Sequence, residues 1–98
     1  MVTKKYSKDG KTCRVKFELP AVVTARTAFI YGDITGRESS PKKMKRLGAG
    51  GLSATVSLPC GHAYRFHYVL DGVRWMSDPD ADITIPNVFG MEESIVKV

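Results

Sequence analysis

The sequence predicts an antiparallel β-sandwich of about seven short strands. In several stretches apolar side chains recur at every second residue, which is the spacing of a strand with one buried face. Glycine, proline and aspartate separate these stretches at short intervals, as turns do in an all-β domain. The chain has 98 residues, of which 43% are hydrophobic. This is enough for one domain with a modest core.

The first sixty residues contain four predicted strands. Residues 13–19 alternate cleanly and end at Pro20, and residues 52–58 alternate again. Between them lie a more apolar stretch, residues 27–31, and a shorter one, residues 44–47, followed by a glycine-rich turn. Residues 1–10 show no such pattern, so we expect a flexible N-terminus and a single domain over residues 11–98.

A hairpin dominates the last third of the chain. Tyr64, Phe66, Tyr68 and Leu70 share one face of a strand, while Arg65, His67 and Val69 share the other. Asp71-Gly72 then forms the strongest two-residue turn signal in the chain, because a type I′ turn needs positive φ at both central residues.

The hairpin turn leads into residues 73–76, which include the only tryptophan, Trp75. We expect Trp75 to lie beside His67 on the outward face and to be substantially exposed to solvent. Residues 94–98 complete the sheet.

Charge is distributed unevenly along the chain, whose net charge is +5. Residues 1–50 hold 12 Lys or Arg against 4 Asp or Glu, whereas residues 51–98 hold 3 against 6. A solvated surface is the favoured interpretation, and a surface for phosphates or acidic proteins is the alternative. Nucleic acid is disfavoured because the basic patch lacks interleaved aromatic residues for base stacking. The patch consists of Arg37, Lys42, Lys43, Lys45 and Arg46.

Targeting and redox features point to the cytoplasm. No apolar run approaches the roughly 20 residues that span a bilayer, so no membrane partner is expected. The N-terminus lacks the apolar region of an export signal. Cys13 lies in the apolar phase of its strand and Cys60 in a turn, so we expect two free thiols, the first protected and the second reactive.

No metal or other cofactor is predicted. The cysteines and histidines lack the paired spacing of a zinc site. Asp78-Pro-Asp-Ala-Asp82 resembles the start of a calcium loop, but Ile83 stands where the loop needs glycine and Phe89 where it needs a bidentate glutamate. Asp78-Pro79 is instead interpreted as a turn between strands.

An ordered series of short motifs resembles a known family. The series begins with Phe29-Ile-Tyr-Gly-Asp33 before Gly36, continues through Leu70-Asp-Gly, Trp75 and Asp78-Pro, and ends with Pro86-Asn and Phe89-Gly. From about Thr12 to Val98 the chain is similar to carbohydrate-binding module family 48. This family includes isoamylase N-terminal domains and the glycogen-binding domain of the AMP-activated protein kinase beta subunit. The resemblance implies an immunoglobulin-like (early-set) sandwich.

The resemblance also implies a set of sugar-binding residues. Trp75 matches one of two tryptophans that stack on glucose, His67 stands where the family has a basic side chain, and Phe89 stands at an apolar loop position. Arg37 occupies the place of the other tryptophan, where its guanidinium plane is the group available to pack on a sugar. Glu93 stands at an amide position and supplies an acceptor without the amide donor.

The expected function is therefore a weak, non-catalytic α-glucan-binding module. The resemblance implies glycogen, starch or maltooligosaccharides as ligands, and a glucan-acting enzyme or a kinase-like protein as partner. An enzyme is not expected, because the catalytic barrel that such modules accompany is absent from the chain. The alternative is a protein-interaction module that keeps the fold and has lost carbohydrate binding.

Overall fold

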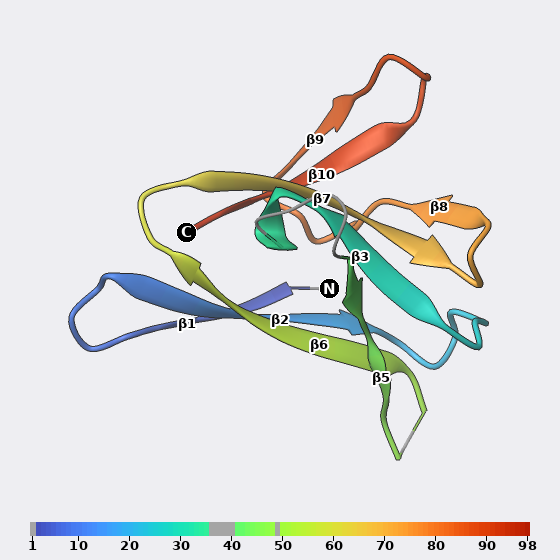
Figure 1. Cartoon of the computed structure of the whole chain (residues 1–98), viewed down its shortest axis with the longest axis horizontal. Helices are drawn as coiled ribbons and strands as arrows, with labels where there is room; N and C mark the ends of the chain where they lie inside the picture. Colours follow the sequence, from blue (N-terminus) through green and yellow to red (C-terminus); the bar gives the residue numbers. More distant parts are fainter. Residues whose placement is uncertain (1, 36–40, 49) are drawn as a thin grey trace.

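The computed structural model describes residues 2–35, 41–48 and 50–98. Two antiparallel sheets pack face to face, so the predicted β-sandwich is confirmed (Figure 1). One sheet has four strands in the order β1-β2-β6-β5 and occupies the lower half of the view. Its strands are β1 (Val2–Tyr6), β2 (Thr12–Leu19), β6 (Leu52–Pro59) and β5 (Lys45–Arg46).

The second sheet has six strands and occupies the upper half of Figure 1. Five follow the order β4-β3-β7-β10-β9, and β8 pairs with β7 beyond the end of β10. A single 3-10 turn, η1 (Asp33–Thr35), follows β3. The strands are β3 (Ala28–Gly32), β4 (Lys42–Lys43), β7 (Ala63–Leu70), β8 (Arg74–Met76), β9 (Ile83–Pro86) and β10 (Glu92–Lys97).

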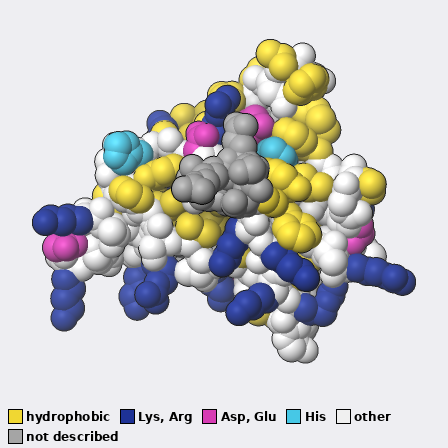
Figure 2. All heavy atoms as spheres, in the orientation of Figure 1, with side chains coloured by type: hydrophobic (Ala, Val, Ile, Leu, Met, Phe, Trp, Pro, Cys, Tyr) yellow, Lys and Arg dark blue, Asp and Glu magenta, His cyan; other side chains and the backbone are white. Residues whose placement is uncertain are grey.

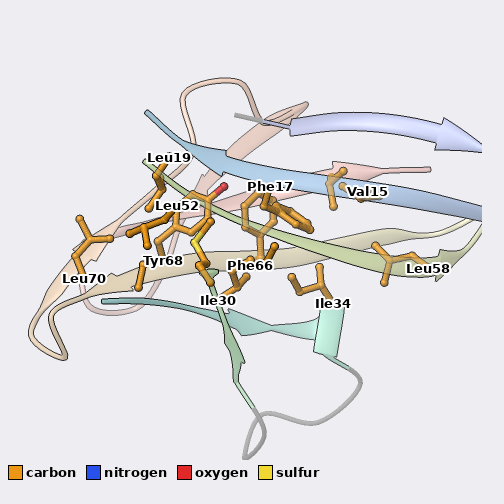
Figure 3. Packing of buried hydrophobic residues seen from close by; sticks show 14 of the residues in the cluster. Val15, Phe17, Leu19, Ile30, Ile34, Leu52, Leu58, Phe66, Tyr68 and Leu70 are labelled. Carbon is orange, nitrogen blue, oxygen red and sulfur yellow. The ribbon is translucent and has the colours of Figure 1, made fainter. Parts of the chain in front are cut away.

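The core fills the space between the sheets, and side-chain alternation decides which residues enter it. In β2 the odd-numbered residues are buried and pack against the even-numbered residues of β7. The rings of Phe17 and Phe66 meet edge to face with centroids 4.9 Å apart (Figure 3). Burying each such side chain contributes about 1.5–3 kcal/mol, so these two strands hold the sheets together.

Three features of the fold differ from the sequence-based expectations. Val2–Tyr6 is an edge strand that pairs with β2 through five residue pairs, where a flexible end was expected. The single strand expected at residues 44–47 is instead two short strands in different sheets, β4 and β5, with the buried Met44 between them. β9 is an additional strand, so the described residues contain ten strands rather than about seven.

The hairpin turn predicted at Asp71-Gly72 is present. Both residues have positive φ, 53° and 75°, and the Val73 N–H donates to the Leu70 carbonyl oxygen at 3.1 Å. This is the geometry of a type I′ turn. The strand register is one residue longer than a two-residue turn gives, because Leu70 pairs with Arg74 rather than Val73. This register places Trp75 opposite Val69, in the outward phase of β7.

The two cysteines are free thiols, as the sequence predicts. Cys13 is fully buried in the core, while Cys60 is partly exposed and packs against the core from the turn after β6. Among the described residues, no helix is long and apolar enough to cross a membrane.

Candidate functional site

The outer face of the six-stranded sheet carries a row of aromatic side chains. Because Phe66 and Tyr68 of β7 point into the core, His67 between them points outward. The register of the sheet places Tyr31 of β3 opposite His67 and Trp75 of β8 opposite Val69. Three neighbouring strands thus present one ring each to the same face.

These three rings are stacked in parallel. The imidazole of His67 lies on the indole of Trp75, with ring centroids 3.4 Å apart and planes within 8°. The phenol ring of Tyr31 is parallel to the imidazole within 7°, at a centroid distance of 5.6 Å. His67 comes from the middle strand, so its ring is held between the other two. We refer to Tyr31, His67 and Trp75 as the ring stack.

The predicted placement of Trp75 is correct in position and wrong in exposure. Trp75 lies beside His67 on the outward face, but its side chain is only partly exposed. His67 covers one face of the indole, and the indole Nε1–H donates to the Glu92 carbonyl oxygen at 2.9 Å. The contact with β10 therefore buries an edge of the ring that the hairpin alone would leave in solvent.

Glu93 lies next to the ring stack. Its Oε2 is 3.4 Å from Nδ1 of His67, and the two side chains are only 15% and 13% exposed. Nδ1 is buried, and within the described part of the chain it makes no hydrogen bond, so the interaction with Glu93 is electrostatic. Burial lowers the pKa of His67, and the Glu93 carboxylate only partly opposes this effect. The imidazole is therefore neutral at neutral pH.

A shallow pocket of about 370 Å³ opens beside the ring stack. The Arg65 backbone N–H donates to Oδ2 of Asp33 at 3.3 Å, and the Arg65 side-chain Nε lies 3.8 Å from the same oxygen. The pocket thus combines aromatic surface with fixed hydrogen-bonding groups. Its lining residues are Tyr31, Gly32, Asp33, Arg65, His67 and Glu93.

Gly32 is required where β3 passes the pocket. Its φ is +125°, a conformation that residues with a side chain rarely adopt. A Cβ atom at this position would also lie 2.3 Å from the Arg65 carbonyl oxygen. Glycine therefore lets β3 approach β7 closely enough to bring Tyr31 against His67.

The structure gathers some of the predicted site residues and not others. His67, Trp75 and Glu93 lie together, whereas Phe89 is at the tip of the β9–β10 hairpin and is 81% exposed. The tip is ordered by Asn87, whose Oδ1 accepts N–H groups from Phe89 at 2.9 Å and Met91 at 3.1 Å. Arg37 lies outside the described residues.

Asp78 has a structural role in the turn after β8. The Tyr68 hydroxyl donates to Oδ2 of Asp78 at 2.6 Å, and the Asp78 N–H donates to Oγ of Ser94 at 2.7 Å. All three residues are fully buried, and the Asp80 N–H donates to the other Asp78 oxygen at 2.8 Å. The interpretation of Asp78-Pro79 as a turn is thus confirmed. No cluster of His, Cys, Asp or Glu suited to a metal ion occurs among the described residues.

Sequence reasoning missed four residues of the pocket, namely Tyr31, Gly32, Asp33 and Arg65. A signal was present, because alternation in residues 27–31 places Tyr31 opposite in phase to the buried Ile30. Arg65 likewise shares the outward phase with His67. What the pattern does not contain is the pairing of β3 with β7, which sets Tyr31 against His67.

A comparison with protein-family models and with curated proteins finds no match for this chain. What the chain binds is therefore inferred from the residues of this outer face and from the motifs in its sequence.

Proposed function

We propose that the protein is a non-catalytic module that binds α-glucan through the outer face of its six-stranded sheet. The observation that carries the proposal is the ring stack of Tyr31, His67 and Trp75 beside a pocket lined by charged groups. The resemblance of the motifs to carbohydrate-binding module family 48 suggests glycogen, starch and maltooligosaccharides as the ligands.

The chemistry of the face suits a chain of glucose units. The faces of a glucose ring carry C–H groups that pack on an aromatic plane, while its hydroxyls need hydrogen-bonding partners. Tyr31 and Trp75 form the two ends of the ring stack. Asp33, Arg65 and Glu93 offer both donors and acceptors. In this proposal Tyr31 supplies a second aromatic platform, which residue 37 does not provide because it is arginine.

Binding is expected to be weak. A stacking contact contributes on the order of 1 kcal/mol, and the ordering of a flexible sugar chain opposes it. We expect a dissociation constant around the millimolar range, which corresponds to about 4 kcal/mol. Such an affinity suits an accessory module that acts beside a glucan-acting enzyme or a kinase-like partner. A cytoplasmic location is part of the proposal, and the two free thiols support it.

Affinity electrophoresis in glycogen gels and NMR titration with maltoheptaose test the proposal. Wild-type protein should be retarded by glycogen, and Trp75→Ala and Tyr31→Ala should each abolish the retardation. Tyr6→Ala is the matched control, because Tyr6 is an exposed tyrosine on β1 of the other sheet. Arg37→Trp should strengthen binding severalfold. A wild type that neither shifts in glycogen nor shows perturbed resonances, with no gain from Arg37→Trp, would contradict the proposal.

A protein-interaction module is the second candidate, and the β9–β10 hairpin favours it. The hairpin projects from the body of the domain, and its tip displays apolar side chains (Figures 1 and 2). Val88 is 93% exposed, Phe89 81% and Met91 40%. Under this alternative, Phe89→Ser should abolish capture of the partner protein while the ring-stack variants leave it unchanged. The glucan proposal expects the variants of Tyr31 and Trp75 to have the larger effect.

A further inference from the structure

The outer face of the four-stranded sheet is strongly basic. Alternation along β2 buries Val15 and Phe17 and turns Arg14 and Lys16 outward. Glu18 shares this face, and its Oε1 lies 3.7 Å from Nζ of Lys16. Across the sheet, Lys5 of β1 lies opposite Arg14, and Lys45 of β5 lies opposite Ser53 of β6. Figure 2 shows Lys and Arg side chains gathered over the lower half of the molecule, where this sheet lies.

The arrangement of these cations does not favour the fold. Lys5 and Arg14 are direct cross-strand neighbours, and like charges directly opposite one another are destabilising. Within residues 2–35, 41–48 and 50–98, no carboxylate pairs with Lys5, Arg14 or Lys45. Lysine on the edge strands β1 and β5 also protects an open sheet edge from pairing with another chain. Arg14 lies on an interior strand, and an anionic partner would account for its position opposite Lys5.

Two hollows on this side of the molecule combine cations with hydroxyl groups. The first, of about 310 Å³, lies over β1, β2 and β6, and the second, of about 220 Å³, lies over β4, β5 and β6. No carboxylate lines either hollow among the described residues. The cations are Lys5, Lys8 and Arg14 in the first hollow and Lys42, Lys43 and Lys45 in the second.

The two hollows meet at β6, which contributes hydroxyl groups to both. Ser57 lines the first hollow, and Ser53 and Thr55 line the second. These residues are two and four positions apart along one strand, or roughly 7–14 Å at about 3.4 Å per residue. The cations lie to either side of these hydroxyl groups, on or beside β1 and β2 in the first hollow and on β4 and β5 in the second.

The composition of the face selects among anionic partners. Protein–protein interfaces place aromatic and apolar residues at their centre and are depleted in lysine. This lysine-rich face therefore does not match a protein partner. Single-stranded nucleic acid needs aromatic platforms, and among the described residues Tyr6 is the one aromatic side chain that lines either hollow. Lysine, arginine, serine and threonine side chains are the groups that contact the phosphates of a duplex.

We propose that this basic face binds the phosphate backbone of double-stranded nucleic acid without sequence preference. The cations and hydroxyl groups of the two hollows contact phosphates along the duplex. The sequence disfavours nucleic acid because the basic patch lacks aromatic residues for base stacking. That argument applies to unstacked bases and not to contacts with the phosphate backbone of a duplex. The first hollow lies on the opposite sheet from the ring stack, and the second is shared with β4 at the edge of the ring-stack sheet. Neither hollow uses a residue of the ring stack or of its pocket, so the proposal is independent of glucan binding.

Fluorescence anisotropy with a labelled 24-base-pair duplex, measured between 50 and 200 mM salt, tests the proposal. With about six phosphate contacts, log affinity should fall against log salt with a slope near −5. Lys5→Gln/Arg14→Gln should weaken binding at least about tenfold and make the slope shallower by about 1.8. This variant should fold normally, because it relieves a like-charge pair, and its thermal midpoint verifies this.

Arg74→Gln/Lys97→Gln is the matched control, because it removes the same charge from the other sheet. The control should keep the wild-type affinity within about twofold. Equal losses in both variants would show that net charge alone acts, and would overturn the proposal. The proposal would also be overturned if the wild type did not bind the duplex, or if it bound vesicles containing 30% phosphatidylserine but not the duplex.

Discussion

At the scale of single residues, the buried contact between Tyr68 and Asp78 stabilises the region that carries the site. The carboxylate is fully buried and receives the tyrosine hydroxyl at 2.6 Å. It also accepts the N–H of Asp80 in the turn that follows β8. The contact therefore links β7 to the segment between β8 and β9.

Removing the hydroxyl of Tyr68 should be costly. Tyr68→Phe leaves the Asp78 oxygen without this donor, so the free energy of unfolding should fall by about 1–3 kcal/mol in urea denaturation. Tyr6→Phe on the exposed edge strand is the control and should change it by less than about 0.5 kcal/mol. Equal stability of Tyr68→Phe and wild type would refute a stabilising role for the contact.

The pKa of Tyr68 gives the same contact a pH dependence. Burial, and then the Asp78 carboxylate, raise this pKa well above its usual range. The unfolded tyrosine loses its proton near pH 10 while the folded one keeps it, so wild type should lose stability as pH rises from about 10. Urea denaturation between pH 9 and 11 should show a smaller loss in Tyr68→Phe. Parallel curves for the two proteins would count against the shift.

His67 should give the fold a dependence on mild acid. Its pKa is lowered, chiefly by burial, although Glu93 faces it from β10 and Arg65 and Tyr31 lie nearby on β7 and β3. The unfolded histidine binds a proton near pH 6.5, and the folded one only at lower pH. Stability is therefore fully present above about pH 6.5 and declines as pH falls through the folded-state pKa.

His67→Gln separates the contribution of His67 to the pH dependence of stability from that of the carboxyl groups. Urea denaturation from pH 7.5 to 5 should show a decline in wild type that is clearly smaller in the variant. NMR titration of the imidazole should also give a pKa below 6.5. A value at or above 6.5 would mean that Glu93 outweighs burial, and would reverse the prediction.

At the scale of elements, the β7–β8 hairpin is held by its turn and by a neighbouring loop. Oδ1 of Asp71 accepts the N–H groups of Arg26 and Thr27 at 2.7 and 3.1 Å, and the Asp71 N–H donates to the Thr27 carbonyl oxygen. The Arg74 side chain also donates to the Thr24 carbonyl oxygen. The turn thus fixes the hairpin to the segment before β3.

Substitutions of Asp71 separate backbone conformation from charge. Asp71→Ala loses both the acceptor oxygen and the tolerance for positive φ, so the thermal midpoint should fall by several degrees. Asp71→Asn keeps a side-chain carbonyl and tolerates this conformation, and should retain most of the stability. If the two variants melt together below wild type, the carboxylate charge rather than the turn geometry would be responsible.

At the scale of the whole molecule, the outer faces of the two sheets differ in chemistry. Lys5, Arg14, Lys16 and Lys45 lie on the outer face of the four-stranded sheet, and the ring stack lies on the six-stranded sheet. Between the sheets, Cys13 is sealed in the core and Cys60 lies at its margin. The sandwich therefore keeps the two proposed binding faces apart and the two thiols in distinct environments.

The thiols allow a test of the whole fold. In native protein only Cys60 should react with a thiol reagent, and slowly, because burial raises the pKa of its thiol. Under denaturing, non-reducing conditions both cysteines should react. A denatured protein that shows no thiol would indicate a disulfide, and a native protein that exposes both would indicate that the core around Cys13 opens readily.

The sequence by itself determined the elements whose pattern is local. Residues 13–19, 52–58 and 64–70 alternate in polarity over seven residues each, and one buried face is enough to impose a strand. Asp71-Gly72 determined its turn because positive φ is a property of those two residues. The same alternation placed His67 outward, whereas Trp75 reaches that face through the observed register, which pairs Leu70 with Arg74.

Only the tertiary structure decided the features that depend on which strands pair with one another. Val2–Tyr6 carries little apolar pattern and becomes a strand because β2 offers it hydrogen-bonding partners. The partial burial of Trp75 depends on a carbonyl oxygen 17 residues away in β10, and the position of Tyr31 depends on the register of β3 against β7. A sequence pattern states which face a side chain occupies, whereas contacts across strands depend on which strands become neighbours.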